Sequence, residues 1–471
     1  MKVFKPYVNG KFITTNNSLI VTEKYTNQHF AKTYLCDKSI LNKTITFTNK
    51  IKTKCKDLTP KQKHTALTLI YKTLEQQKNY FAELISKESA KPLMYALAEV
   101  ERSIVTFKIA SDEVYNLPKE SLNFDVLPNG KGKKGTVKYF PIGVVAGISP
   151  FNFPLNLAVH KIAPAIASGC PIILKPASTT PLSILALAKI IAKTKLPKGM
   201  VNILPMNREV GNCLVTNDKI NLISFTGSPE VGWAIKNNCG KKKIVLELGG
   251  NAATIISKNC KPNLIIDKCI MGAFAYSGQI CIHAQRFYVH NKHYNLFLKL
   301  MKEKTEKLIS GNPISTKTQV SVMIDEQNAI RAEKWTNKAI KQGAKLICGG
   351  KRNENYFEPT ILTNTNKTML VNAEEVFAPI ICVEKYSGKI ENAITKVNDS
   401  KFGLQCGVFT SNKIELNKCF DLVEVGGIIH NHVPTLRFDN MPYGGIKESG
   451  LGREGIKYAI QDMLEPKVLV Y

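Results

Sequence analysis

The sequence predicts an α/β protein with a doubly wound parallel sheet, a second α/β domain and a small projecting hairpin. From residue 141 to 249, continuous apolar runs of strand length alternate with segments of helical period, as parallel strands covered on both faces do. A looser alternation of the same kind follows over residues 250–445. Between residues 119 and 140, the turn-rich run Leu127–Gly132 separates two short extended stretches, which indicates a hairpin.

The composition is that of a globular protein in a reducing environment. The 471 residues suffice for two or three domains. The twelve cysteines form no Cys-x-x-Cys pair, which argues against a zinc ribbon or a disulfide framework. Cys281 and His283, like His290 and His293, lack further ligands at metal-binding spacing, so we expect no metal site. With neither a signal-peptide core nor a run of eighteen apolar residues, we expect a cytoplasmic protein outside the membrane.

The formal net charge of +28 raises the question of nucleic-acid binding. Only seven of the 65 basic residues are arginines, and the lysines are spread along the chain. Arginine supplies the planar fork that reads bases and phosphates, whereas lysine is a solvated point charge. We therefore attribute the charge to compositional bias and expect no specific nucleic-acid partner. A basic, non-catalytic binding protein is the alternative.

The first 118 residues show packing elements and no chemistry. Residues 1–60 are polar and are predicted to form a peripheral segment. Apolar residues at helical spacing then predict one helix from Thr59 to about Ile85, with Pro60 in its first turn. A further helix is predicted over about residues 92–115.

The regular alternation after residue 141 predicts a Rossmann-like sheet. Such sheets bind ligands at the carboxyl ends of their strands, and dinucleotides are common ligands. The expected strands are 144–148, 172–174, 201–204, 222–225 and 244–248, and the expected helices are 154–168, 181–193, 208–215 and 229–237.

Three of these strand ends carry polar residues suited to ligand binding. Asn152 precedes a helix that begins with a proline and could direct its amide at an oxyanion. Lys175 and Ser178 follow the second strand and suit a ribose or phosphate. Ser228 after Gly227 is a plausible N-cap, where free amides favour an anion such as pyrophosphate. Turns and caps in any α/β protein are the alternative explanation.

Glu247 and Cys281 are the candidate reactive groups. Glu247 ends a buried strand and is followed by two glycines. Partial desolvation would raise the pKa of this carboxyl toward that of a general base, although a salt-bridged glutamate is the alternative. Cys281 follows the flexible Gly278 among small and apolar residues, where a thiolate could meet a substrate. A cysteine that fills core volume is the alternative there.

The second α/β domain is predicted from a less regular alternation. Two segments stand out within and beyond it, the acidic pair Glu374–Glu375 before Phe377 and the glycine-dense loop 442–455. The expected strands are 252–257, 285–290, 357–362, 378–386, 405–410 and 426–430, and the expected helices are 262–275, 291–309, 325–342, 390–399 and 413–423.

Five of these segments, in the same order, resemble the aldehyde dehydrogenase superfamily. Ile148–Pro154 is similar to its Asn-Phe-Pro motif, Glu247–Gly250 to its Glu-Leu-Gly-Gly motif and Gly278–Cys281 to its Gly-Gln-x-Cys motif. Glu374–Pro379 and Tyr443–Gly455 resemble two further blocks of the family. The resemblance extends from about Pro141 to Pro466. The residues of its motifs are most similar to those of the branch that contains lactaldehyde and phosphonoacetaldehyde dehydrogenases.

The resemblance implies NAD(P)-dependent oxidation of an aldehyde to a carboxylic acid. The Cys281 thiolate would attack the aldehyde, the Asn152 amide would hold the oxyanion, and hydride transfer to the nicotinamide would leave a thioester. Glu247 would then activate water to hydrolyse that thioester. By the same matching, Lys161 and Glu454 occupy positions of proton relay and of support for the base. An acylating enzyme that uses coenzyme A is the alternative.

The resemblance also implies a site for NAD or NADP. Strict NAD enzymes of the family often carry a glutamate where this chain has Ser178, so NADP is expected to be admitted. The implied cofactor-binding residues are Ser149, Lys175, Ser178, Arg208, Gly227, Ser228, Gly232, Glu375 and Phe377. Arg102 and Arg437 are candidates for binding an acidic substrate tail.

The implied domain organisation has three parts. Residues 1–118 and 141–249 would form the dinucleotide-binding domain, and residues 250–445 the catalytic domain. Residues 119–140 and 446–471 would form an oligomerisation arm and a C-terminal segment. From the way the family assembles, we expect a homodimer or homotetramer.

Overall fold

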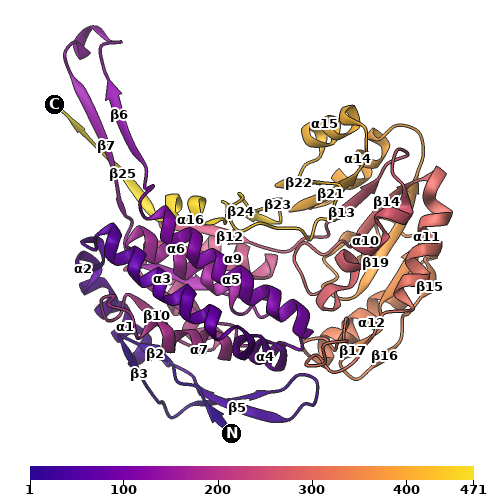
Figure 1. Cartoon of the computed structure of the whole chain (residues 1–471), viewed down its shortest axis with the longest axis horizontal. Coiled ribbons are helices and arrows are strands. Elements are labelled where there is room, and N and C mark those ends of the chain that lie inside the picture. Colours follow the sequence, from indigo (N-terminus) through magenta and orange to yellow (C-terminus); the bar gives the residue numbers. More distant parts are fainter.

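Two mainly parallel sheets form two lobes, and a hairpin arm projects from one of them (Figure 1). The computed structural model describes residues 1–471. Each lobe alternates strands and helices, as the sequence predicts. No helix has the length and apolar character that crossing a membrane requires.

The first sheet has eight strands in the order β24-β12-β11-β8-β9-β10-β2-β3. Its central strands, from β12 to β10, are parallel, whereas β24, β2 and β3 run antiparallel to their neighbours. The chain winds outward from β8 in both directions, so the topological switch point lies between β8 and β11. The strands are β2 (Tyr7–Val8), β3 (Lys11–Phe12), β8 (Val145–Ile148), β9 (Ile172–Lys175), β10 (Val201–Ile203), β11 (Leu222–Thr226), β12 (Lys243–Glu247) and β24 (Gly450–Leu451).

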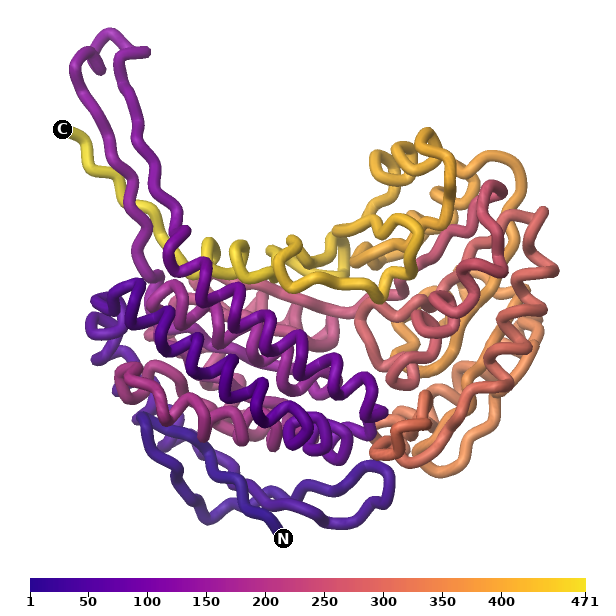
Figure 2. The backbone as a smooth tube through the Cα atoms, in the orientation of Figure 1, coloured from indigo at the N-terminus to yellow at the C-terminus, as the bar shows by residue number.

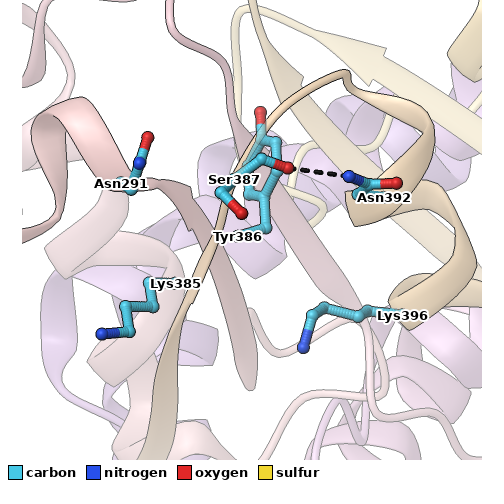
Figure 3. Close-up of a pocket in the computed structure, with 6 residues that line it drawn as sticks. All are labelled: Asn291, Lys385, Tyr386, Ser387, Asn392 and Lys396. Carbon is cyan, nitrogen blue, oxygen red and sulfur yellow. Dashed lines mark hydrogen bonds between the residues drawn. The ribbon is translucent and has the colours of Figure 1, made fainter.

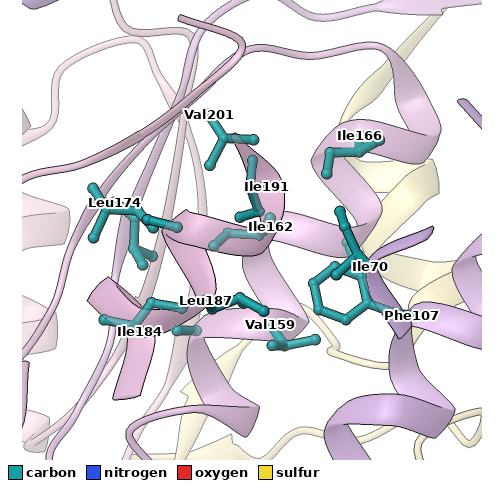
Figure 4. Close-up of a cluster of buried hydrophobic side chains, with 14 of the residues drawn as sticks. Ile70, Phe107, Val159, Ile162, Ile166, Leu174, Ile184, Leu187, Ile191 and Val201 are labelled. Atoms are coloured by element: carbon teal, nitrogen blue, oxygen red, sulfur yellow. The ribbon is translucent and has the colours of Figure 1, made fainter. Parts of the chain in front are cut away.

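Helices cover both faces of this sheet because its strands are apolar on both sides. Val145 belongs to a cluster with α3 to α7 and α16, whereas its neighbour Ala146 packs with α1, α8 and α9 on the other face. Figure 4 shows Ile162 of α6 and Leu187 of α7 in the first cluster. The helices are α1 (Lys38–Lys50), α2 (Lys52–Lys56), α3 (Pro60–Gln76), α4 (Lys78–Ser89), α5 (Leu93–Glu113), α6 (Asn156–Ser168), α7 (Leu182–Ile191), α8 (Arg208–Thr216), α9 (Pro229–Asn238) and α16 (Ile456–Asp462).

Two predictions for the first 118 residues are wrong. Residues 1–60 are not wholly peripheral, because β2 and β3 extend the edge of the first sheet and Phe4 and Tyr7 are buried in the core. The remaining strands of this segment, β1 (Lys2–Val3), β4 (Ser18–Thr22) and β5 (His29–Tyr34), form a separate small sheet. The single helix predicted from Thr59 to Ile85 is divided at Gln77. This residue is both the C-cap of α3 and the N-cap of α4.

The second sheet has seven strands in the order β15-β18-β19-β14-β13-β21-β22. All its pairings are parallel except that of β15 with β18. The strand expected over 357–362 is divided around Pro359 into β17 (Tyr356–Phe357) and β18 (Thr360–Thr363). The other elements of this lobe are β13 (Ala253–Ile256), α10 (Ile266–Phe274), β14 (Arg286–His290), α11 (Asn291–Thr305), α12 (Glu326–Lys341), β15 (Lys345–Cys348), β16 (Arg352–Asn353), α13 (Leu370–Ala373), β19 (Ile380–Tyr386), α14 (Glu391–Asn398), β20 (Phe402–Gly403), β21 (Gln405–Phe409), α15 (Lys413–Leu422), β22 (Gly427–His430) and β23 (Ile446–Lys447).

The arm is the predicted hairpin, extended by the end of the chain. Strand β6 (Lys119–Asn123) pairs with β7 (Lys134–Pro141), and β25 (Leu464–Val470) pairs with the other edge of β7. Residues 446–471 contribute strands to three different sheets. Strand β23 pairs with β20, β24 pairs with β12, and β25 then joins the arm. Figure 2 shows this final segment crossing from the second lobe over the first and on to the arm.

Candidate active site

A strained turn presents Cys281 at the junction of the two lobes. Tyr276, Ser277 and Gly278 all have left-handed backbone angles, with φ of 49°, 53° and 69°. The two non-glycine residues are held there because the Tyr276 hydroxyl donates to the Ser89 carbonyl at 3.1 Å and the Ser277 hydroxyl is also bound to a backbone carbonyl. A β-carbon on Gly278 would lie 2.1 Å from the Ala378 carbonyl oxygen, so only glycine fits. Tertiary contacts therefore fix the turn.

Asn152 is bound to the same turn. Its side-chain nitrogen donates to the Gln279 carbonyl at 2.9 Å. The Gln279 side-chain oxygen in turn accepts from the Ile324 amide at 3.0 Å. Since an amide nitrogen carries two hydrogens, Asn152 keeps one more donor beyond this bond. The two sequence motifs are thus brought into direct contact.

The Cys281 thiol is half-buried and has one hydrogen-bonding partner. Its Sγ lies 2.9 Å from the hydroxyl oxygen of Tyr443. Burial raises the pKa of the thiol to about 11, although the Tyr443 hydrogen bond and the Arg437 cation both act to lower it.

A cavity of about 180 Å³ opens beside this thiol. Its lining is largely hydrophobic, with a few convergent polar groups, as in sites for small organic substrates. Arg437 Nε and Thr435 Oγ1, both from lining residues, are buried without a hydrogen-bonding partner. The lining residues are Lys91, Tyr95, Ala98, Glu99, Arg102, Phe153, Leu157, Met271, Ala275, Tyr276, Ile280, Cys281, Ile282, Thr435, Arg437 and Tyr443.

Glu247 ends β12 as a buried carboxyl without hydrogen bonds. Neither of its carboxyl oxygens has a partner. Burial, and then the nearby Glu454 charge, raise the pKa of Glu247 well above its ordinary value. A β-carbon on Gly250 would lie 3.0 Å from the Cys281 carbonyl oxygen, so the strand end is in close contact with the thiol-bearing segment. The structure thus brings Asn152, Glu247 and Cys281 to one place.

Lys161 and Glu454 form a buried ion pair behind this site. The Lys161 ammonium is 3.2 Å from one Glu454 oxygen and also donates to Thr226 at 2.7 Å. The other Glu454 oxygen accepts from the Arg437 guanidinium at 3.0 Å. Against the effect of burial, the Lys161 and Arg437 cations hold the pKa of Glu454 well below its ordinary value. Glu454 is therefore an ionised link between Lys161 and the cavity wall.

Arg102 belongs to a second charged group on the same wall. Its guanidinium donates to Asp439 at 2.7 Å, and the His160 ring lies 2.8 Å from the same carboxylate. His160 is also 3.5 Å from Arg437, which joins the two groups. Both arginines expected to bind an acidic substrate tail thus lie at the cavity, each already paired with a carboxylate.

A separate cavity of about 670 Å³ lies beyond the carboxyl ends of β8, β9 and β11. Lys175, Ser178 and Arg208 all line it. Its position at the switch point and its two cationic side chains suit a dinucleotide with an anionic phosphate group. Ser149, which directly follows β8, does not line this cavity, and its buried hydroxyl has no hydrogen-bonding partner.

Gly227, Ser228 and Gly232 do not line that cavity. Ser228 occupies the N-cap position of α9, but its side chain makes no capping hydrogen bond. A β-carbon on Gly232 would lie 2.3 Å from a Leu248 side-chain carbon, so packing favours glycine at this position. The cofactor-binding roles of these three residues stay predictions.

Glu375 lies against the glycine pair Gly249–Gly250, and Phe377 follows it two residues later. Gly250 donates its amide to Glu375 at 3.1 Å, and a β-carbon on Gly249 would lie 2.3 Å from the same carboxylate. Burial raises the pKa of Glu375 to about 7. Phe377 has a left-handed φ of 44°, and its ring meets Phe151 edge to face.

Another cavity, of about 600 Å³, contains none of the predicted site residues. Figure 3 shows it at the ends of β14 and β19, with a hydrogen bond from the Asn392 side chain to the Ser387 carbonyl. It offers two lysines and two asparagines, but no nucleophile beside an unpaired carboxylate. The reactive groups therefore favour the Cys281 cavity.

Sequence reasoning missed two features of the site. It gave Tyr443 no role beyond its motif, although the hydroxyl contacts the thiol. The helices around Lys91 and Glu99 are predicted only as packing elements, whereas these residues form a fully buried ion pair at the cavity. A lysine and a glutamate eight residues apart on the apolar segment 90–100 were the available signal.

Comparison with known protein families gives one match over nearly the whole chain. A model of the aldehyde dehydrogenase family matches residues 12–469. The 3-sulfolactaldehyde dehydrogenase of Priestia aryabhattai is 39% identical over 472 residues, covering 100% of this chain and 98% of that relative. The lactaldehyde dehydrogenase of Methanococcus aeolicus is 40% identical over 474 residues, covering 98% of this chain and 99% of that relative.

Solved structures with the same fold include complexes with a product and with a cofactor. Aldehyde dehydrogenase 21 from Physcomitrella patens, in complex with its reaction product succinate, gives a TM-score of 0.98 at 39% identity, covering 100% of this chain and 98% of that one. The glyceraldehyde-3-phosphate dehydrogenase GapN from Methanocaldococcus jannaschii, complexed with NADP, gives a TM-score of 0.93 at 36% identity, covering 97% of this chain and 100% of that one.

Proposed function

Because the chain belongs to the aldehyde dehydrogenase family, we propose that it oxidises a short aldehyde to its carboxylic acid through a thioester on Cys281. The observation that carries this proposal is the convergence of Asn152, Glu247 and Cys281 from three separate segments. A nucleophile, an oxyanion donor and a water-activating base are the groups that such a reaction needs.

The first half of the reaction uses Cys281 and Asn152. The thiolate attacks the aldehyde carbon, and the carbonyl electron pair moves to the oxygen. The free hydrogen of the Asn152 amide stabilises that oxyanion, while its other hydrogen remains bound to the Gln279 carbonyl. Bound NAD(P) supplies the acceptor for the hydride that leaves the substrate carbon.

The second half uses Glu247. Burial raises the pKa of Glu247, which makes its ionised carboxylate a stronger base toward water than an exposed carboxylate. The resulting hydroxide attacks the thioester carbon and releases the acid with the Cys281 thiolate. The Lys161–Glu454 pair lies behind this base and offers a route for the proton to leave. An acceptor such as coenzyme A would not need Glu247, so hydrolysis is favoured over acyl transfer.

The cofactor is NAD or NADP, and we expect the first sheet to bind it. Lys175 and Arg208 place cations in the cavity at the switch point, and no carboxylate lines that cavity to repel a 2′-phosphate. This favours admission of NADP. In the proposed organisation, residues 1–118 and 141–249 bind the cofactor and residues 250–445 present the nucleophile.

The substrate is proposed to be a short aldehyde that also carries a hydroxyl or an anionic group. A cavity of about 180 Å³ restricts the length of the chain. The unpartnered Arg437 Nε and Thr435 Oγ1 leave hydrogen-bonding capacity that an alkyl chain could not use. Lactaldehyde, 3-sulfolactaldehyde and succinate semialdehyde have this chemistry.

The assembly is proposed to be a homodimer or homotetramer formed through the arm. Val468, Leu469 and Val470 of β25 are exposed on this projecting sheet. Apolar side chains on an exposed sheet edge favour association. Light scattering at micromolar concentration should give a multiple of the chain mass, and a monomeric mass would contradict this assembly.

Turnover with a panel of aldehydes tests the proposed function. Formation of NADH or NADPH, followed at 340 nm, should be faster with lactaldehyde or succinate semialdehyde than with propanal or butanal, and should not require coenzyme A. A strict requirement for coenzyme A would identify an acylating enzyme instead. Absence of turnover with every aldehyde would contradict the proposal.

A further inference from the structure

Tyr443 provides the single hydrogen-bonding contact of the proposed nucleophile. Its hydroxyl oxygen lies 2.9 Å from Cys281 Sγ, although the two residues are 162 positions apart. We propose that Tyr443 is a further catalytic residue, which donates a hydrogen bond to the Cys281 thiolate and so favours ionisation of the thiol. This inference rests on the proposed function in taking Cys281 as the nucleophile.

The tyrosine is held rigidly enough for this role. Its backbone amide donates to the Glu454 carbonyl at 3.0 Å, and the Glu454 amide donates back to the Tyr443 carbonyl at 2.6 Å. The ring is buried and packs with Ile282 and Leu404. A side chain with both its backbone and its ring fixed loses little further freedom when it binds the sulfur.

The hydroxyl keeps its own proton. Burial, and then the adjacent thiol, raise the pKa of Tyr443 well above its ordinary value. The phenol therefore stays neutral at physiological pH, and its hydrogen bond to an ionised sulfur can only be donated by the oxygen. When the thiol ionises, its proton passes to solvent and Tyr443 remains protonated.

Arg437 strengthens Tyr443 as a donor. Its guanidinium carbon lies 3.7 Å from the centre of the Tyr443 ring, and the group is kept there by its ion pair with Glu454 at 3.0 Å. A cation over the face of a phenol draws electron density from the ring and makes the hydroxyl a stronger donor. The same cation also acts directly on the sulfur, because its charge lowers the thiol pKa.

The thiol needs such a donor because no basic side chain is hydrogen-bonded to it. With its pKa raised to about 11 by burial, only a small fraction of Cys281 is thiolate at neutral pH. When the thiolate attacks a carbonyl carbon, its charge moves to the carbonyl oxygen and the bond from Tyr443 weakens. Tyr443 thus stabilises the attacking form of the enzyme, and Asn152 the product of the attack.

The test is the pH dependence of Cys281 alkylation in Tyr443→Phe. This variant removes one oxygen and keeps the ring. Iodoacetamide is applied to the whole protein over a range of pH, and mass spectrometry of the Cys281 peptide separates this thiol from the other eleven cysteines. We expect the midpoint of the rate profile to rise by about one pH unit and alkylation at pH 8 to slow about threefold to tenfold. Tyr115→Phe, which removes a phenol oxygen from an exposed ring outside the cavity, is the matched control and should behave as the unmodified protein.

An unchanged or lower midpoint in Tyr443→Phe, with thermal unfolding like that of the parent, would overturn the proposal. Faster alkylation would show that the hydroxyl restrains the thiol instead of activating it. Because alkylation requires neither aldehyde nor cofactor, it separates this inference from the proposed function. If no aldehyde is turned over but the predicted midpoint shift is present, the proposed function is rejected. The activation of the Cys281 thiol by Tyr443 is then still supported.

Discussion

Gly444 lies so close to Glu247 that a β-carbon on it would stand 2.7 Å from the Glu247 carboxyl oxygen. The same β-carbon would also lie 2.7 Å from the Gly452 carbonyl oxygen. The glycine-dense loop 442–455 therefore packs directly against the proposed base. The absence of a side chain at position 444 allows this close contact. The loop also carries Tyr443 and Glu454, so it joins the nucleophile, the base and the buried ion pair.

Gly444→Ala should impair hydrolysis more than binding. The added methyl group must displace either the Glu247 carboxyl or the loop backbone, which costs about 1–3 kcal/mol of stability. We expect kcat to fall about tenfold or more with a smaller change in KM, since the base is displaced from the water that it activates. Gly311→Ala is the control, because its β-carbon would meet nothing closer than 3.6 Å. Equal kinetics in the two variants would argue against the steric relationship.

Glu247→Gln should remove turnover and stabilise the fold. A glutamate whose pKa is raised in the folded state favours folding most below its unfolded pKa of about 4.3, and that contribution is lost as the pH rises through the folded pKa. The neutral glutamine avoids this loss. We expect no gain at pH 4 and a gain of about 1–3 kcal/mol at pH 8 in denaturant unfolding. A variant less stable than the parent at pH 8 would show that the carboxylate is satisfied there.

Glu454→Gln should be strongly destabilising. It leaves Lys161 and Arg437 buried without their shared carboxylate, and breaking such a buried pair costs about 3–5 kcal/mol. Glu306→Gln breaks the exposed pair with Lys302 and should cost less than about 0.5 kcal/mol. Chemical denaturation of both variants measures the difference. Similar losses would mean that solvent reaches the buried pair.

Ser178→Glu should change the choice of cofactor. A carboxylate placed in the cavity with Lys175 and Arg208 would repel a 2′-phosphate and could accept hydrogen bonds from a ribose. We expect kcat/KM for NADP to fall about tenfold to a hundredfold while that for NAD is retained or improved. Parallel titrations with the two cofactors provide the internal control. A loss that is equal for both would place the 2′-phosphate elsewhere.

The parallel sheets were predictable because their strands are buried on both faces. Such strands form continuous apolar runs, as Ile244–Leu246 does immediately before Glu247, the last residue of β12. The two-residue strands β2 and β3 were missed, because two residues display no periodicity. The break at Gln77 was missed for a similar reason, since α3 and α4 continue the same helical pattern on both sides of it.

Site residues were predictable where the residue type and its local sequence already suggest a chemical role. They were not predictable where the role depends on a contact that only the folded chain makes. Cys281, Glu247 and Asn152 stand at conspicuous turns or strand ends. Tyr443 is one phenol in a glycine-dense loop, and only the folded chain brings it to the thiol. Gly232 illustrates the converse, because its position in the sequence suggests a phosphate site but does not reveal its close packing against Leu248.

The most direct test of the central claim is the mass of Glu247→Gln after it has reacted with an aldehyde and NADP. Without the base, the acyl group should remain on the enzyme. We predict one equivalent of NADPH per chain, without further turnover, and a matching mass increase on the peptide that contains Cys281. Sustained turnover at the parent rate, or an acyl group on any other residue, would contradict the account.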